Sequence, residues 1–337
     1  MSKWLKLFIV SAVFSFTILI VLIYQINSAF NNPLNIVGSQ ILVVDKGQYA
    51  HSVINKIHQR GILKHPLLVK AALKLEPELS HIKTGTYELT LGMSARDMFN
   101  VLSKGLEKTY QITLIEGLRW QDWLIQLNNH PQLNKSEKTF EQWITTFDPD
   151  LPGASLEGWL LADTYHFTNG TDVEEIVKRA HQALKDYLTS AWETRQVDLP
   201  YDNPYQALIM ASIVEKETGV PIERPRIAAV FVNRLREGMR LQTDPTVIYG
   251  MGDSFDGNIR RKDLRQATPY NTYVIKGLPP TPIAMPSRLS IDAVLHPIQS
   301  EEFYFVSKGD GTHYFSTTLD EHNRAVRQYQ LKKTKSN

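Results

Sequence analysis

The clearest potential chemistry in this sequence lies in the triplet Glu215-Lys216-Glu217, at the end of a predicted helix. At about 100° per residue, Glu217 lies on a side of the helix with bulky apolar residues, whereas Glu215 points the opposite way. The apolar residues on the side of Glu217 are Met210, Ile213 and Val214. A carboxyl group held against apolar side chains has a raised pKa, because its ionised form is disfavoured. Glu217 is therefore predicted to donate a proton, as glycosidic cleavage requires.

Periodicity leaves an ordinary alternative open for this triplet. The helix is predicted from Pro204 to Glu217, since Asn203 can cap its start and Gly219 suits its end. Charged residues are common at helix ends, so both glutamates could be solvated residues of the last turn. In the catalytic interpretation only Glu217 acts on the substrate, so a Glu215→Gln substitution is the control for Glu217→Gln.

Polar residues in a predicted turn could assist this carboxyl group. Gln242, Thr243 and Asp244 precede Pro245, which biases the chain away from helical geometry and suggests an exposed turn. One interpretation has these three residues binding sugar hydroxyl or N-acetyl groups beside Glu217. The other is turn chemistry, with Asp244 capping the next segment. Asp244 is also the best candidate for a second catalytic carboxylate, if one operates.

Two tyrosines and an asparagine are candidates for a sugar-binding wall. Tyr249, Asn271 and Tyr273 combine apolar ring faces with polar tips, which suits stacking on and hydrogen bonding to a sugar. The alternative is that they belong to the core, where aromatic residues are more common.

Other chemistries find little support in the sequence. The ten histidines form no His-Glu-x-x-His motif, and no Gly-x-Ser-x-Gly elbow is present. The absence of cysteine excludes thiol nucleophiles and disulfides. With 37 Lys and Arg against 35 Asp and Glu, the net charge of +2 is too balanced to suggest a nucleic-acid partner. No metal and no cofactor are therefore expected.

The N-terminal segment is predicted to anchor the chain in a membrane. Residues 7–26 form an apolar, charge-free run that is long enough to span a bilayer. Lys3 and Lys6 precede the run and no Lys or Arg follows until Lys46, so the N-terminus is expected to stay cytoplasmic. A cleaved signal peptide is the alternative, but its apolar region is usually shorter and ends in small residues. Residues 27–39 are interpreted as a short tether.

Three segments then repeat one pattern, a strand-like stretch followed by glycine and a helical pattern. The strands are expected at 41–44, 87–89 and 112–115, before Gly47, Gly92 and Gly117. After each glycine, apolar residues at +6, +7 and +10 share one helical face. These residues are Val53, Ile54, Ile57, Met98, Phe99, Leu102, Trp123, Leu124 and Leu127. Two of the helices are expected to end near Gly61 and Gly105.

The second half of the chain is predicted to be largely helical. Helices are expected over 173–195, 204–217 and 225–237, with a closing helix over 319–330. Five prolines make 268–286 a constrained loop, because they exclude both regular helix and central strand. Segments 303–306 and 312–316 flank a Lys-Gly-Asp-Gly turn and are expected to form a β-hairpin.

Several separated blocks, all in one order, resemble the YceG-like endolytic murein transglycosylases over nearly the whole chain. The blocks are Leu156-Glu157-Gly158-Trp159, Ala211 to Thr218, Asn233-Arg234-Leu235, Leu241 to Gly250, Tyr270-Asn271-Thr272-Tyr273 and Gly277-Leu278-Pro279-Pro280. The resemblance implies cleavage within nascent glycan strands, between N-acetylmuramic acid and N-acetylglucosamine, leaving 1,6-anhydro-muramyl ends. It also implies that Glu217 is the catalytic glutamate and that the Thr218 hydroxyl helps to position the carboxyl group or the substrate.

Taken together, these features predict an α+β protein with a single N-terminal transmembrane helix. The expected parts are a cytoplasmic tip (1–6), the membrane helix (7–26), the tether (27–39), a LysM-like subdomain (40–108) and an α+β catalytic domain (109–337). No glycan-binding residues are assigned to the LysM-like part, which could equally be a scaffold. By resemblance, the body is periplasmic, attached to the inner membrane, and works on peptidoglycan strands near the synthases of elongation or division. Two rivals remain, a two-carboxylate hydrolase using Glu217 and Asp244, and a non-catalytic wall-binding scaffold.

Overall fold

The computed structural model describes residues 3–139, 142–143, 152 and 155–331, which form two compact units. Unit 1 comprises Met1–Tyr110 with His166–Gly170, and unit 2 comprises Gln111–Tyr165 with Thr171–Asn337. Met1 and Ser2 of the predicted cytoplasmic tip lie outside the described residues. Helices and short two-stranded sheets are mixed throughout the described residues, in agreement with the predicted combination of both element types.

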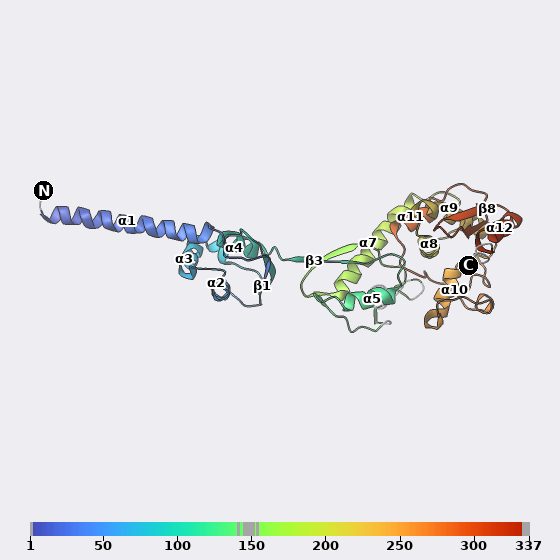
Figure 1. Cartoon of the computed structure of the whole chain (residues 1–337), viewed down its shortest axis with the longest axis horizontal. Helices are drawn as coiled ribbons and strands as arrows, with labels where there is room; N and C mark the ends of the chain where they lie inside the picture. The colour runs from blue at the N-terminus through green and yellow to red at the C-terminus, as the bar shows by residue number, and fades with distance from the viewer. Residues whose placement is uncertain (1–2, 140–141, 144–151, 153–154, 332–337) are drawn as a thin grey trace. The chain divides into compact units, whose positions relative to one another are not determined.

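Unit 1 begins with the long apolar helix α1 (Lys3–Asn31), shown in blue in Figure 1. By length and composition, α1 is the one described helix that could cross a membrane. Its 29 residues correspond to about 43 Å at 1.5 Å per residue, which exceeds a hydrocarbon core of about 30 Å. The helix therefore has length to spare beyond a single crossing.

The predicted tether over 27–39 differs from the structure. Helix α1 continues through this segment to Asn31, and the residues that follow it pack into the core of unit 1. Phe30, Leu34 and Ile36 are all buried, at 1%, 8% and 3% exposure. The scattered apolar residues of this segment are thus core residues, and no free linker separates α1 from the rest of unit 1.

The rest of unit 1 surrounds a two-stranded antiparallel sheet. Strands β1 (Gln40–Val44) and β2 (Gly85–Leu89) pair with Leu42 opposite Tyr87, and both of these side chains are buried. Helices α2 (Ala50–Gln59) and α4 (Ala95–Lys104) follow the two strands, as the repeated pattern predicted. Their six predicted apolar residues are all fully buried, and Gly105 ends α4 in a left-handed conformation.

Two elements of unit 1 were not predicted. Helix α3 (Pro66–Leu75) and the short 3-10 helix η1 (Pro77–Ser80) lie between α2 and β2. Whether unit 1 is LysM-like stays a prediction.

Unit 2 contains short strands and a larger helical body. Strand β3 (Thr109–Thr113) pairs with β5 (Thr164–Thr168), and the boundary between the units falls within both strands. Within unit 2, β4 (Leu133–Asn134) runs parallel to β6 (Thr171–Asp172). Helix α5 (Trp120–Asn128) follows β3 as predicted, with Trp123 and Leu127 buried and Leu124 only half-buried. Helix α7 (Val173–Glu193) then leads into the helical body.

The core of unit 2 is built around helix α8 (Pro204–Glu217), whose bounds are the predicted ones. Helices α9 (Arg224–Arg236) and α11 (Arg288–Leu295) pack against it. Every residue from 207 to 215 is buried, so α8 has no solvated side along this stretch. The side of α8 that Glu217 was predicted to share with Met210, Ile213 and Val214 is buried, and so is the opposite side, because neighbouring elements cover the helix all round.

The remaining elements of unit 2 include the predicted hairpin. Strands β7 (Tyr304–Ser307) and β8 (His313–Ser316) pair antiparallel, and α12 (Leu319–Val326) follows with a π-helical turn, η6 (Arg327–Leu331). Helix α10 (Asp244–Met251) and the 3-10 turns η3 (Pro221–Glu223), η4 (Gly252–Ser254) and η5 (Asp263–Arg265) also belong to unit 2. Segment 268–286 contains no helix or strand, as its prolines predicted.

Gly158 provides a test of packing in unit 2. It has φ +79°, and an added Cβ would lie 2.4 Å from Cβ of Pro282. We expect Gly158→Ala to lower the free energy of unfolding by about 3 kcal/mol or more, through backbone strain and overpacking together. Gly277 also has φ +79° but nothing within 4 Å. Gly277→Ala should therefore cost only the left-handed strain of about 1–2 kcal/mol. Equal shifts in denaturant midpoint for the two full-length variants in detergent would contradict this explanation.

Candidate active site

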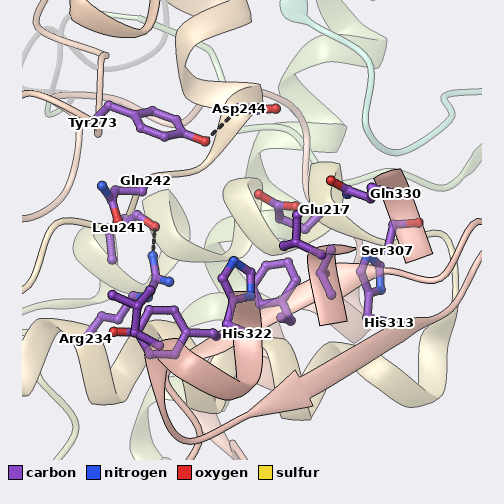
Figure 2. A pocket seen from close by; sticks show the side chains of 15 residues that line it. Glu217, Arg234, Leu241, Gln242, Asp244, Tyr273, Ser307, His313, His322 and Gln330 are labelled. Atoms are coloured by element: carbon purple, nitrogen blue, oxygen red, sulfur yellow. Dashed lines mark hydrogen bonds between the residues drawn. The ribbon is translucent and has the colours of Figure 1, made fainter. Parts of the chain in front are cut away.

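A cavity of about 440 Å³ opens beside the end of α8 (Figure 2). Its walls come from α8, α9, the segment before α10, the loop after η5, the β7–β8 hairpin and the C-terminal helical turns. The side chains labelled in Figure 2 are Glu217, Arg234, Leu241, Gln242, Asp244, Tyr273, Ser307, His313, His322 and Gln330. The cavity thus collects polar groups from segments that are far apart in the sequence.

Glu217 is the carboxyl group at the end of α8 that faces this cavity. Burial is the main cause that raises the pKa of Glu217 to about 7, and the nearby carboxylate of Asp244 raises it further. The Thr243 hydroxyl, which donates a hydrogen bond to Oε1, acts in the opposite direction, as do His313 and Arg234. A carboxyl group with this pKa can both give and take a proton near neutral pH.

Thr243 is held in place by a cluster of buried threonines. The backbone N–H of Thr243 donates to Oγ1 of Thr272 at 3.1 Å, and Oγ1 of Thr246 donates to the Thr243 carbonyl at 2.7 Å. The hydroxyl groups of Thr246 and Thr272 lie 2.8 Å apart. Gln242 precedes this cluster with φ +50° and lines the cavity. The hydroxyl group that contacts Glu217 is therefore fixed by packing and hydrogen bonds.

Asp244 and Tyr273 form a second polar pair on the wall of the cavity. The Tyr273 hydroxyl donates to Oδ1 of Asp244 at 2.6 Å, as the dashed line in Figure 2 shows. Both residues were candidates from the sequence, and the structure brings them to the same cavity as Glu217 and Gln242, while Thr243 contacts Glu217.

A histidine that the sequence interpretation had set aside also lines the cavity. His313 of β8 has Nδ1 at 2.8 Å from Oε2 of Glu223, and its backbone N–H donates to Oε1 at 3.0 Å. A carboxylate on Nδ1 fixes the ring orientation and favours the proton on that nitrogen. The pair was missed because its members lie 90 residues apart and follow no metal-ligand spacing.

Arg234 links three parts of the site. Its Nε donates to the carbonyl of Phe303 at 2.7 Å, and Nη1 donates to the carbonyl of Leu241 at 2.6 Å. The guanidinium carbon also lies over the Tyr304 ring, at 5.2 Å from its centroid. Arg234 thus joins α9 to the hairpin and to the segment before α10. It belongs to a sequence block noted for its family resemblance, although its role was not foreseen.

Besides Thr243, which contacts Glu217 but does not itself line the cavity, three sequence candidates are not among the lining residues. The Thr218 hydroxyl accepts from the N–H of Val220 at 3.0 Å. Asn271 is buried and donates to the carbonyls of Asp263 and Gln266 at 3.0 and 2.7 Å. These contacts account for Thr218 and Asn271 as residues that shape turns. Their predicted roles in binding stay predictions.

Tyr249, the third of these candidates, contacts a second buried carboxyl group. Its hydroxyl donates to Oε2 of Glu157 at 3.2 Å, and the backbone N–H of Trp120 donates to Oε1 at 2.9 Å. Burial raises the pKa of Glu157 to about 7. The sequence interpretation assigned no role to Glu157, although it lies within one of the family-like blocks. Glu157 is not among the residues lining the cavity of Glu217.

Glu215, named from the sequence as the control for Glu217, has a structural role of its own, and the alternative in which it is a solvated residue of the last turn does not hold for it. It is buried, and its Oε1 accepts from Nη2 of Arg224 at 2.9 Å. Its Oε2 accepts from the N–H and hydroxyl of Ser287 at 2.9 and 2.5 Å and from the Ser290 hydroxyl at 2.7 Å. Since Arg224 begins α9 and Ser287 caps α11, Glu215 joins three helices. Glu215 therefore has a structural role, and substituting it is not a harmless control for substituting Glu217.

Comparisons with known proteins agree with the family-like blocks. A family model described as the YceG-like family matches residues 42–328. An endolytic murein transglycosylase of Bacillus subtilis (strain 168) is 33% identical over 271 residues, which cover 74% of each chain. One from Streptococcus pneumoniae serotype 2 is 24% identical over 320 residues, which cover 85% of this chain but 57% of that protein.

A solved structure is also similar to this chain. A putative YceG-like protein from Listeria monocytogenes, solved in a crystal at 2.6 Å, gives a TM-score of 0.54 at 27% identity. The match covers 85% of this chain and 99% of the other.

Substitution by glutamine should affect the stability of the fold differently at the two glutamates of α8. We expect Glu215→Gln to lower the free energy of unfolding by about 3 kcal/mol, because it leaves the Arg224 guanidinium buried without its counter-charge. Glu217→Gln should not destabilise the fold near pH 8, because it removes a carboxylate whose ionisation is opposed by burial. Denaturant unfolding of both full-length variants, with hydrogen exchange across α8, measures the difference. A stable Glu215→Gln protein would contradict the structural role.

Proposed function

This chain belongs to the YceG-like family, and from that premise we propose how it acts as a lytic transglycosylase on peptidoglycan. The proposed reaction is endolytic: it cleaves the bond between N-acetylmuramic acid and N-acetylglucosamine within nascent strands and leaves 1,6-anhydro-muramyl ends. Such cleavage would end the elongation of a strand. The observation that carries this proposal is the Glu217 carboxyl group, with a pKa of about 7, in a cavity of about 440 Å³.

The cavity suits a saccharide in both size and lining. Its volume falls in the range of about 300–1,000 Å³ that is usual for small-molecule sites. Tyr273 offers an aromatic ring, and Gln242, Asp244 and Ser307 offer polar groups that can bind hydroxyl or N-acetyl groups.

In the proposed mechanism, Glu217 uses one carboxyl group twice. The protonated acid donates to the glycosidic oxygen as the bond from this oxygen to C1 of the muramyl residue breaks. The resulting carboxylate then takes the proton of the muramyl C6 hydroxyl, whose oxygen forms the new bond to C1. No water is consumed, and Glu217 ends in its starting state. Because Thr243 donates to Oε1, Oε2 is the atom assigned to carry the transferred proton.

Neighbouring charges set the balance between the two roles of Glu217. Asp244 favours the protonated form that begins the reaction, whereas His313 and Arg234 favour the carboxylate that follows proton donation. Glu223 holds His313 in place, so the hairpin supplies this part of the electrostatic environment.

The two rival functions make different demands on the same residues. A two-carboxylate hydrolase needs Asp244 as a free base or nucleophile, but one oxygen of Asp244 already accepts the Tyr273 hydroxyl. A non-catalytic scaffold gives no reason for a buried, protonatable carboxyl group facing a cavity. The lytic mechanism needs only one carboxyl group and is therefore favoured.

We further propose that α1 anchors the chain in the cytoplasmic membrane with the body on the periplasmic side. The charge-free run over 7–26 and the lysines before it support this orientation. Synthases of the elongation or division machinery are the proposed neighbours, because nascent strands emerge at the same membrane. Glycan binding by unit 1 stays open.

Cleavage should slow as the pH rises through about 7, because Glu217 then loses the proton that it must donate. Asp244→Asn removes a carboxylate that raises the pKa of Glu217, so the alkaline limb of the kcat/KM profile should move to lower pH. His313→Gln removes a group that lowers this pKa, so the limb should move to higher pH. Shifts of the same sign in both variants would contradict the assignment of Glu217 as the acid.

The products separate the lytic reaction from its rivals. We expect mass spectrometry of peptidoglycan treated with the full-length protein to detect 1,6-anhydro ends. Glu217→Gln should reduce their release by about 100-fold or more, because a carboxamide is no general acid. Fragments with reducing ends only would establish a hydrolase, and release by Glu217→Gln at the wild-type rate would refute the assigned role. Gly277→Ala is the control variant, since Gly277 lies outside the cavity lining.

A further inference from the structure

We propose that helix α3 lies in the headgroup region of the membrane that α1 spans, with its outward face against phospholipid. The inference rests on the proposed membrane anchoring by α1. It assigns to unit 1 a lipid-binding surface, defined as Leu67, Ala71, Lys74 and Leu75 of α3.

The composition of α3 is unusual for a surface helix of a soluble domain. Its inner side, with Val69, Ala72 and Leu73, is buried in the core of unit 1. At about 100° per residue, the lipid-binding surface is the opposite side of the helix, where polar residues would be expected. Instead, Leu67 and Leu75 are 76% and 74% exposed there. Seven of the ten residues of α3 are Leu, Val or Ala, so apolar side chains occupy both sides.

The position of α3 along α1 indicates what covers this exposed side. Leu75 and Ala72 share a hollow with Ile23 and Ile26 of α1. These two isoleucines belong to the last turns of the apolar run over 7–26. If the run is embedded, α3 lies level with the boundary between hydrocarbon and headgroups. In Figure 1, α3 is the element of unit 1 closest to the apolar part of α1.

The other end of α3 lies at the same level. Its residue Leu68, with Lys64 and His65 just before the helix, lines a second hollow together with Tyr24, Gln25 and Ser28 of α1. Both ends of α3 therefore line hollows with the stretch between Ile23 and Asn32, and α3 packs against α1.

The charges on α3 suit an anionic lipid surface. Every charged side chain of the helix is a lysine, and Lys64 and Lys74 are exposed. Lys70 donates to Oδ1 of Asn55 at 3.0 Å and is directed to the protein. Glu76 follows the helix and is paired with Arg96, so it does not cancel the lysines. Leucines with flanking lysines are the composition of helices that lie in a bilayer interface.

The absence of cysteine allows a direct test in the full-length chain. Single variants Leu67→Cys and Leu75→Cys carry a polarity-sensitive fluorophore in nanodiscs made of zwitterionic and anionic phospholipids. Ser15→Cys, in the middle of α1, reports the anchor. Leu106→Cys is the control for a probe in water, because Leu106 is 60% exposed. It follows the last turn of α4, whereas the first turn of α4 is the one that contacts the end of α1. Nitroxide groups near the top of the lipid acyl chains serve as quenchers.

We expect blue-shifted emission at positions 67 and 75 and several-fold stronger nitroxide quenching than at position 106. If position 15 is embedded but 67 and 75 behave like 106, the inference fails while the anchor stands. If position 15 is not embedded, the proposed anchoring fails, and the inference with it. Blue-shifted probes at 67 and 75 that lipid nitroxides do not quench would show a second copy of the chain on this surface, which also overturns the inference.

Discussion

The site of this protein depends on one buried interaction, the pairing of the Glu215 carboxylate with Arg224, Ser287 and Ser290. A charge buried within a helical core is tolerated only when it is paired and its oxygens are hydrogen-bonded. Glu215 meets this condition with donors from α9 and α11, so the pairing also fixes both helices against α8. Because α8 ends only two residues later, the same contacts determine where Glu217 enters the cavity.

Two glutamates separated by one residue thus serve different purposes because their surroundings differ. Glu215 pairs with the Arg224 guanidinium through one oxygen and accepts hydrogen bonds from Ser287 and Ser290 on the other, so its side chain holds neighbouring helices together. Glu217 has one hydroxyl donor and a second carboxylate nearby, and partial burial raises its pKa, so these surroundings favour a proton that can be exchanged. The chemistry of the site therefore follows from tertiary packing at the end of α8 and cannot be assigned to residue type.

The sequence predicted elements whose signals are local. The start of α8 was predicted from Asn203 as the capping residue and Pro204 in the first turn, and its end from Gly219. The hairpin was predicted from the glycine-rich turn between its strands. Glu217 was selected because it shares one side of α8 with apolar residues, but both sides of the helix are buried, so that criterion does not by itself distinguish it from Glu215; what distinguishes it is that it faces the cavity. Glu223, His313 and Arg234 were missed because they meet Glu217 or one another only through long-range contacts, which periodicity does not encode. Helix α3 was missed because apolar residues on both of its sides weaken the helical pattern.

The connection between α1 and unit 1 changes how an anchor would act on the folded body. A tether of flexible chain would let the body sample many orientations, and each encounter with a strand would then carry an entropic cost. Instead, α1 continues into the core through Phe30, and Pro33 pairs with Ser94 at the start of α4. Arg96 adds a hydrogen bond to Asn31 at 2.8 Å and lies over the Phe30 ring. The end of α1 is therefore ordered when unit 1 folds, so a spanning α1 would set the orientation of unit 1 before any strand binds.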